Sequence, residues 1–309
     1  MTQHTPPCPL CAAGSRYALT AGDRNRETTA ERFVYNRCSA CGTLFMVDVP
    51  ADLAPYYAGD YHLFDADGEP EWKRNPTLLD VETFRVRLLR GHVQTGPLID
   101  VGAGAGAFAA AAKQAGFDVT AIEMDERCCR YMNEGLGVAA ICSDQPISQL
   151  QSLASARVIS LWHSLEHLRE PAAMLAAAAA RLLDGGILAI GVPNPDSLQF
   201  RLLRSRWPHL DAPRHLSLMP ASALIAHART LGLRCVQQTT SDPFALACNV
   251  HGWAYALRRR PADGPASPAV GQAAGVIAKL ASPVERSGNR GAALTVLLEK
   301  PPADAGASA

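Results

Sequence analysis

The sequence lacks a charge excess of either sign, a long hydrophobic run and a recognisable leader. Its 29 basic and 29 acidic side chains cancel to a formal net charge of zero. Proteins that bind nucleic acid usually carry a basic excess, so the composition argues against that class of partner. No apolar segment approaches the ~20 residues of a membrane-spanning helix, and the start, MTQHTPPCPL, lacks the basic-then-apolar pattern of a signal peptide. We therefore expect a cytoplasmic protein without a membrane partner.

A disulfide framework is also disfavoured. The nine cysteines are an odd number, and the chain of 309 residues is long enough to bury one sizeable core and a small extra module without covalent cross-links. Five of the cysteines occur outside any paired motif, and we expect them to be reduced, small and buried. These five are Cys128, Cys129, Cys142, Cys235 and Cys248.

The other four cysteines form two CxxC pairs, Cys8 with Cys11 and Cys38 with Cys41. Each pair can present two thiolates to one tetrahedral Zn²⁺. Residues 12–37 separate the pairs, a longer gap than the about 15–20 residues usual between such pairs. Four thiolates leave no open position, so the predicted zinc is structural, and so small a segment needs a metal to fold. The alternatives are four free thiols or, without a surrounding βαβ pattern to favour it, a redox pair.

Residues 96–240 alternate short β-branched runs with Ala- and Leu-rich helical runs. This alternation predicts a mostly parallel sheet with helices on both faces. An amphipathic helix is expected over about 76–91, and a helix that begins at Pro171 is expected to end at Gly185 and Gly186. The predicted strands are 97–101, 118–123, 138–142, 157–162, 186–192 and 233–239, with a late strand at 292–300 that pairs back with 233–239 at the sheet edge.

The run LIDVGAGAGAF, residues 98–108, places three glycines directly after a strand. Gly102 can form the turn, Gly104 lets the backbone approach a ligand, and Gly106 lets the next helix pack closely. Sites for dinucleotides and for S-adenosylmethionine share this pattern, and both use an acid such as Glu123 for the ribose hydroxyls. Asp100, just before the turn, favours the cationic ligand, S-adenosylmethionine, over a pyrophosphate.

Further motifs carry a family resemblance: CPLC, RCSACGTLF, YYAGDYHLF, LWHSLEHLREP, DAPRHLSLMP and the closing strand. With the glycine turn, they resemble bacterial class I S-adenosylmethionine-dependent methyltransferases of the small-molecule group with an N-terminal zinc-binding segment. The resemblance covers roughly 8–240 and 289–301 and implies a Rossmann-like, seven-stranded sheet whose last strand is antiparallel. The expected cofactor contacts are Asp100, Gly102, Ala103, Gly104, Gly106, Glu123, Met124, Ser143, Asp144, Trp162 and Tyr61, the last from a Tyr-rich segment that closes over the cofactor in relatives.

The catalytic candidates follow the fourth strand of the predicted sheet. His163, Glu166 and His167 would lie at its carboxyl end, where open α/β sheets bind ligands, and His215 lies in a Pro-x-His-Leu stretch that the family shares. Methyl transfer needs alignment of the acceptor and, for some acceptors, a base, for which histidine is best suited. The alternatives are histidines bonded in caps or loops, or an HxxxH metal pair without an evident third ligand.

The sequence therefore predicts a zinc-binding segment at 1–50, a helical, Tyr-rich linker and cofactor lid at 51–95, and a methyltransferase domain at 96–301. Within that domain, 242–288 is expected to shape the substrate pocket, and 302–309 is expected to be a disordered tail.

The predicted activity is methyl transfer from S-adenosylmethionine to a small molecule, such as a sugar or a natural-product intermediate. The first alternative is an RNA or protein methyltransferase that docks its substrate through the zinc segment. Neutral charge and the missing [DN]PP[YFW] motif argue against it. A nicotinamide oxidoreductase and a non-catalytic zinc module are weaker alternatives.

Overall fold

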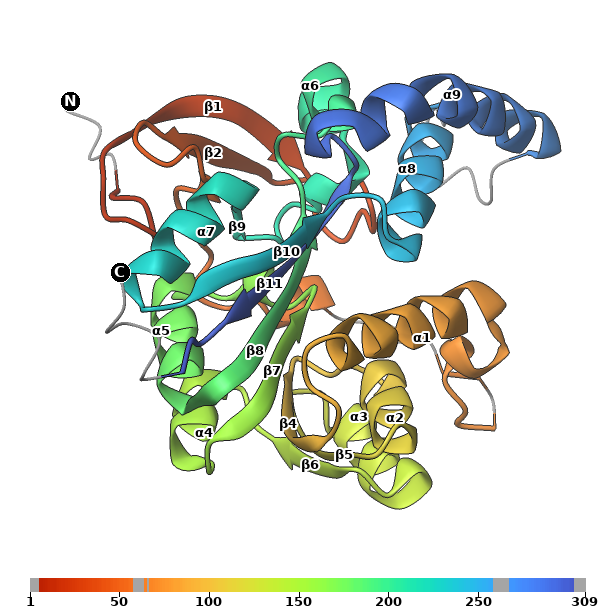
Figure 1. The fold of residues 1–309 in the computed structure, drawn as a ribbon. Coiled ribbons are helices and arrows are strands. Elements are labelled where there is room, and N and C mark those ends of the chain that lie inside the picture. Colours follow the sequence, from red (N-terminus) through yellow and green to blue (C-terminus); the bar gives the residue numbers. More distant parts are fainter. Residues whose placement is uncertain (1–5, 58–63, 66, 258–266, 303–309) are drawn as a thin grey trace.

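The fold is built on a seven-stranded sheet with helices on both faces (Figure 1). The structure, a computed structural model, describes residues 6–57, 64–65, 67–257 and 267–302. The strand order is β10-β11-β8-β7-β4-β5-β6, and β11 is antiparallel to both of its neighbours, as the resemblance implies. The strands are β4 (Gly96–Val101), β5 (Phe117–Glu123), β6 (Ala139–Cys142), β7 (Ala156–Trp162), β8 (Leu182–Pro193), β10 (Arg234–Thr239) and β11 (Ala293–Glu299).

The late strand β11 pairs with β10 at the sheet edge, as expected, and lies one strand in from that edge. It is inserted between β8 and β10, and β10 is the edge strand. The burial of the two strands explains this order, because six of the seven residues of β11 are buried whereas no residue of β10 is. An apolar strand is favoured in the interior, and the polar strand RCVQQT tolerates the solvent-facing edge.

Each face of the sheet is covered by its own set of helices. Leu98 packs on one face with Leu89 and Phe108, whereas Ile99, the next residue of β4, packs on the other face with Met174. The first face carries α1 (Pro76–Arg90), α2 (Ala107–Gln114), α3 (Glu126–Arg130) and a one-turn π-helix (Tyr131–Leu136); the second carries α4 (Pro146–Ser152), α5 (Pro171–Arg181) and α7 (Ala221–Thr230).

The helix that begins at Pro171 ends earlier than predicted. It stops at Arg181, and β8 follows directly, so that Gly185 and Gly186 lie inside a strand. Gly185 has φ +71°, and a Cβ on Gly186 would come 2.9 Å from the carbonyl oxygen of Arg157. The two glycines therefore form a bulge where the register between β7 and β8 shifts. Glycine is favoured both at the end of a helix and in a β-bulge, so the sequence pattern does not distinguish these two structures.

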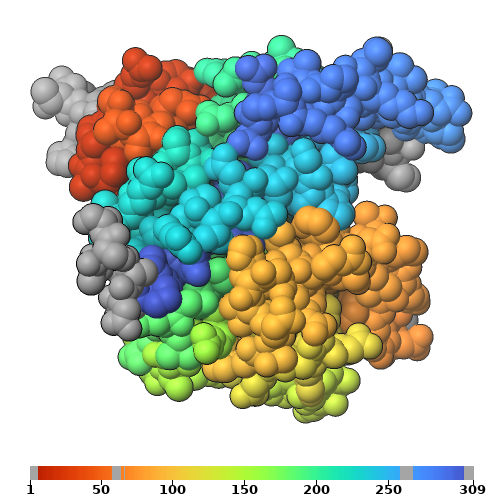
Figure 2. All heavy atoms as spheres, in the orientation of Figure 1, coloured from red at the N-terminus to blue at the C-terminus, as the bar shows by residue number. Residues whose placement is uncertain are grey.

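The excursion before β11 is helical. It contains α8 (Pro243–Ala256) and α9 (Pro268–Arg286), and α9 runs along the outer end of the molecule (Figure 2). A buried carboxylate joins the two helices, because Glu285 of α9 accepts hydrogen bonds from Trp253 Nε1 at 2.9 Å and from Gln199 Nε2 at 3.2 Å. Gln199 lies in α6 (Leu198–Leu203). Short helices span Ala54–Tyr57, Glu71–Arg74, Leu165–His167, Arg204–Arg206, Pro208–Leu210 and Ser287–Asn289.

The N-terminal segment forms a second sheet that shares a strand with the rest of the chain. Its strands are β1 (Ser15–Gly22), β2 (Arg32–Cys38) and β3 (Leu44–Met46), and the fourth, β9 (Ser217–Leu218), comes from the loop after α6. The sheet of the N-terminal segment is therefore completed by residues from outside 1–50. No helix of the described part of the chain is long and apolar enough to cross a membrane. Of the predicted tail at 302–309, all residues after Pro302 lie outside the described residues.

A buried ion pair fixes the second sheet to the main domain. Arg214, which is fully buried, donates to Asp23 Oδ1 at 2.7 Å and to Asp211 Oδ1 at 2.6 Å. Burial alone would raise the pKa of Asp23, but the hydrogen bonds and the charge of Arg214, with help from Thr28, lower it to about 2.

We expect Asp23→Ala to lower the free energy of unfolding by about 3 kcal/mol, because it removes one partner of a buried ion pair. The exposed Asp118→Ala is the matched control, and urea unfolding is the measurement. A carboxylate whose pKa falls on folding stabilises the protein above its unfolded pKa of about 3.9 and loses that contribution as the pH falls. The gap between wild type and Asp23→Ala should therefore shrink between about pH 4 and pH 2. An equal effect of both substitutions would contradict the role of Asp23.

Candidate cofactor and acceptor site

The glycine turn lies at the carboxyl end of β4, in the middle of the sheet. Gly102 and Gly106 have φ values of +74° and +79°, which L side chains rarely adopt. A Cβ on Gly102 would come 2.4 Å from Cβ of Ser164, and one on Gly106 would come 2.6 Å from Cγ of Met132. These two positions therefore need glycine both for their backbone conformation and for the close packing of the turn.

Glu123 lies beside the turn, at the end of β5. Its carboxylate accepts hydrogen bonds from the backbone N–H groups of Gly104 at 2.7 Å, Met124 at 2.8 Å and Asp125 at 3.0 Å. The side chain thus ties the glycine turn to the neighbouring strand. A carboxylate has about four acceptor positions, so one remains for a ligand hydroxyl.

Asp100 is the acidic group beneath the turn. It is 2% exposed and accepts one hydrogen bond from Ser160 Oγ at 2.7 Å. Burial raises its pKa to about 7, and the bond from Ser160 offsets only part of this rise. A cation placed nearby would favour the ionised form, which fits the prediction of a positively charged ligand.

Sequence reasoning missed two charged residues of α1, Glu82 and Arg85. They form a buried ion pair, with Arg85 Nη1 at 3.0 Å from Glu82 Oε1. The Arg85 guanidinium lies over two rings, 4.5 Å from the centre of Trp162 and 5.2 Å from that of Phe244. An i,i+3 ion pair on a helix usually faces solvent. Glu82 and Arg85 instead share the buried face of α1 with Val81, and their spacing from Val81 could have indicated from the sequence that they are buried.

The remaining predicted cofactor contacts lie around the ends of β5 and β6. Met124 is 59% exposed directly after Glu123, and Ser143 donates its N–H to the Glu123 carbonyl at 2.8 Å. Asp144 is exposed. Tyr61 lies outside the described residues. Trp72, which sequence reasoning also missed, donates Nε1–H to the carbonyl of Ala105 in the glycine turn at 3.0 Å.

His163 and Glu166 follow β7 and contact each other. His163 has φ +56°, a strained value for a residue other than glycine, and such strain is concentrated at functional sites. Its Nδ1 lies 3.3 Å from Glu166 Oε1, and its ring packs at 4.2 Å on Phe244 of α8. The side chain of His163 is 22% exposed, whereas that of Glu166 is fully buried. The structure thus joins two of the predicted catalytic residues.

His167 and His215 lie against each other beside Glu166, with ring centres 4.7 Å apart. Nδ1 of His167 is 2.8 Å from the hydroxyl of Tyr57 and 3.1 Å from the carbonyl oxygen of Arg214. Burial, followed by the neighbouring His215, lowers the pKa of His167 to about 4, so its ring is neutral at pH 7. The four catalytic candidates therefore form one cluster, although they come from two segments about 50 residues apart.

The second sheet holds the loop that carries His215. Tyr35, which lies fully buried in β2, donates its hydroxyl to the carbonyl of His215 at 2.9 Å. The carbonyl of Arg214 faces His167, and the side chain of Arg214 is bound by Asp23. The position of His215 beside His167 therefore depends on residues of the N-terminal segment.

The four predicted zinc ligands converge. Cys8 Sγ lies 3.7 Å from Cys41 Sγ, Cys11 Sγ lies 3.5 Å from Cys38 Sγ, and all four sulfur atoms are within 4.8 Å of one another. A tetrahedron with Zn–S bonds of about 2.3 Å has edges of about 3.8 Å, which fits this spacing.

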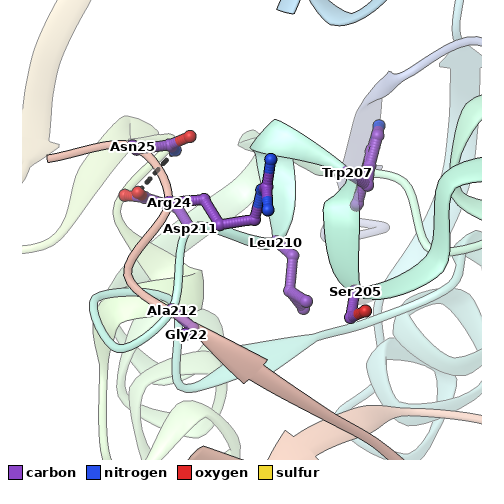
Figure 3. A pocket seen from close by; sticks show the side chains of 8 residues that line it. All are labelled: Gly22, Arg24, Asn25, Ser205, Trp207, Leu210, Asp211 and Ala212. Carbon is purple, nitrogen blue, oxygen red and sulfur yellow. Dashed lines mark hydrogen bonds between the residues drawn. The ribbon is translucent and has the colours of Figure 1, made fainter. Parts of the chain in front are cut away.

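Two hollows lie near the second sheet rather than at the glycine turn. The smaller, of about 10 Å³, has a volume that suits one water molecule. It is lined by Gly22, Arg24, Asn25, Ser205, Trp207, Leu210, Asp211 and Ala212 (Figure 3). Asn25 donates there to Asp211 Oδ1 at 2.6 Å. The larger, of about 140 Å³, is lined mainly by apolar side chains, among them Pro6, Pro9 and Leu168, together with Arg169 and Ser217.

A seven-stranded sheet with a reversed strand, a central glycine turn and an acid on the next strand define a Rossmann-like methyltransferase of class I. The sequence agrees, because residues 74–238 match the family described as "Methyltransferase domain". The match covers more than half of the chain, which therefore belongs to this family of S-adenosylmethionine-dependent enzymes. This assignment argues against the alternatives of a nicotinamide oxidoreductase and a non-catalytic zinc module.

Curated relatives and solved structures agree with this family. The chain is 28% identical over 178 residues to the "Ubiquinone biosynthesis O-methyltransferase" of Bordetella avium, covering 54% of this chain and 74% of that protein. It is 28% identical over 146 residues to the protein of that name from Xanthomonas campestris, covering 45% of this chain and 59% of that one. An O-methyltransferase family protein from Burkholderia thailandensis shares the fold, with a TM-score of 0.51 at 16% identity over 81% of this chain and 63% of that one.

Glu123→Ala should weaken the binding of S-adenosylhomocysteine by roughly 2–3 kcal/mol, because it removes a charged acceptor beside the turn. Isothermal titration calorimetry is the measurement, and the exposed Glu126→Ala of the following helix is the control. The parent protein should not bind NAD. Tight NAD binding without a response to S-adenosylhomocysteine would contradict the assignment of the turn.

Proposed function

We propose that the enzyme methylates a small molecule. The observation that carries this proposal is the enclosure of the candidate acceptor side. His163 is mostly buried between β7 and α8, its ring packs on Phe244, and Arg85 covers the neighbouring Trp162. Such a site suits a compact acceptor better than a folded macromolecule. The relatives named for ubiquinone biosynthesis and the neutral net charge support the same class.

The residues around the turn fit S-adenosylmethionine, which supplies an activated methyl group when bound. Glu123 would accept a hydrogen bond from a ribose hydroxyl at its remaining acceptor position, and Asp100 would face the cationic end. Arg85, an arginine close to Asp100 and Trp162, would bind the carboxylate of the amino acid part. Met124, Ser143 and Asp144 would border the adenine, with the exposed thioether of Met124 against its face.

The acceptor would be aligned by the cluster that follows β7. In-line displacement at a sulfonium carbon depends mainly on orientation, and a base is needed where the acceptor holds a proton. We assign the base to His163, because Glu166 contacts its Nδ1 and leaves Nε2 to face the acceptor. His167 and His215 would form the wall of the acceptor site, and α8, within the excursion at 242–288, would close it through Phe244.

The four thiolates of Cys8, Cys11, Cys38 and Cys41 would hold a structural Zn²⁺. The sulfur spacing and the burial of Cys8 and Cys38 support this proposal. The ion would brace the second sheet, which in turn holds the loop with His215. The N-terminal segment therefore serves the acceptor site in this proposal rather than docking a macromolecule.

His163→Ala should slow methyl transfer about 10²–10⁴-fold, the range for loss of a general base. The assay uses labelled S-adenosylmethionine with catechols, simple phenols, sugars and amines as acceptors, and the exposed His92→Ala is the control. Affinity for S-adenosylhomocysteine should barely change. If His163→Ala keeps near-full turnover, the residue is structural, and alignment alone drives the reaction. Transfer to RNA or protein but to none of the small molecules would overturn the proposed acceptor class.

Cys38→Ser should remove one equivalent of tightly bound zinc per chain and lower the melting temperature. Metal binding there supplies folding free energy to the second sheet. Metal analysis of protein purified without added metal, with Cys235→Ser as the matched cysteine control, checks this. A wild-type protein that is folded yet holds less than about half an equivalent of zinc in these thiolates would refute the structural site.

A further inference from the structure

A second group of metal-ligand side chains lies away from the cysteines. One ligand atom from each of Glu166, His167 and His215 falls within 4.8 Å of the other two. Glu166 and His167 belong to the short helix Leu165–His167, and His215 comes from the loop before β9. The group does not complete the HxxxH pair of the sequence, because it contains His167 but not His163.

The carboxylate of Glu166 is the least satisfied charge of the group. The residue is 0% exposed, and neither of its oxygens has a hydrogen-bond partner in the described part of the chain. Nδ1 of His163 approaches its Oε1 at 3.3 Å, outside hydrogen-bond geometry. A buried carboxylate without donors is costly unless a positive charge compensates it, so this side chain is suited to bind a cation.

Both histidines of the group are oriented as metal-ligating histidines are. Nδ1 of His167 faces the carbonyl oxygen of Arg214 at 3.1 Å, and Nδ1 of His215 faces that of His209 at 2.9 Å. A carbonyl only accepts, so a proton on Nδ1 would satisfy each of these contacts and leave Nε2 to bind a metal. The hydroxyl of Tyr57, 2.8 Å from Nδ1 of His167, donates to the Arg214 carbonyl at 3.4 Å and so can accept from that Nδ1–H. Histidines that bind a metal typically donate their second ring N–H to a backbone carbonyl in this way. Asp211 Oδ2 is 3.9 Å from Nε2 of His215, too far for a hydrogen bond.

We propose that Glu166, His167 and His215 bind one divalent transition-metal ion of the zinc type, separate from the ion held by the four cysteines. Two imidazoles and one carboxylate form a donor set that suits zinc and its neighbours such as Co²⁺, whereas Mg²⁺ prefers oxygen ligands alone. The carboxylate has two oxygens, so it can bind the ion and still contact His163.

Three protein ligands leave a coordination position open, and an ion with an open position can polarise an oxygen bound there. In the methyltransferase this would favour acceptors that present a hydroxyl or phenol oxygen. That consequence rests on the proposed function, whereas the binding of the ion does not.

The test uses the full chain with zinc in the cysteine site, and Co²⁺ as the probe. Titration should show one further equivalent of bound Co²⁺ by equilibrium dialysis. Its spectrum should contain only weak visible bands, without the strong thiolate-to-metal absorption that cysteine ligation produces. Glu166→Gln and His215→Ala should each weaken Co²⁺ binding at least 100-fold, and the exposed His92→Ala should not.

Binding of S-adenosylhomocysteine provides the folding check and separates the two proposals. Glu166→Gln, a substitution of equal size, should keep this binding while it loses Co²⁺. Equal Co²⁺ affinity of wild type and Glu166→Gln, or thiolate bands for all bound Co²⁺, would overturn the metal site. Parent protein that binds Co²⁺ through these residues yet fails to bind S-adenosylhomocysteine would instead overturn the proposed function and leave the metal site standing.

Discussion

Arg214 is fully buried, and two carboxylates from distant parts of the chain hold its guanidinium group. Asp23 follows the first strand of the second sheet, and Asp211 precedes Arg214 by three residues. Because a buried guanidinium cannot lose its proton, it needs both acids in place. The backbone of Arg214 then faces His167, and the next residue carries the ring that packs on it. One ion-pair cluster thereby links the N-terminal segment to the candidate acceptor site.

The cofactor side of the site is organised more locally. Glu123, the last residue of β5, accepts a hydrogen bond from the N–H of Gly104 in the turn after β4, and β4 and β5 are paired in parallel. Their carboxyl ends meet at one edge of the sheet, so a turn after one strand and an acid after the next are neighbours by topology. Sheet topology does not bring the residues of the candidate acceptor side together in this way. The residues proposed for it come from α1, α8, the segment after β7 and the loop before β9, which long-range packing brings together.

Two groups of ligands differ in how they are held. The four cysteines occupy two short knuckles whose sulfur atoms converge from local turns. The cluster of Glu166, His167 and His215 depends instead on backbone carbonyls of Arg214 and His209, which orient the two rings. The first arrangement comes from local turns, whereas the second contains the buried carboxylate of Glu166 and comes from contacts between distant segments. The same N-terminal sheet supports both, because Tyr35 of β2 binds the carbonyl of His215.

The sequence by itself determined the sheet, the glycine turn, the cysteine pairs and the acid Glu123, because each depends on period, spacing or a residue's place after a strand. Where one residue type serves two purposes, as Gly185 and Gly186 do, the pattern predicted a helix stop and the structure has a bulge. Only the tertiary structure decided that β11 lies inside the sheet, that Arg85 covers Trp162, and that His215 meets Glu166 and His167. These three arrangements depend on contacts between segments far apart in the chain. Such contacts arise from the packing of buried charges and rings, and this packing produces no periodic pattern in the sequence.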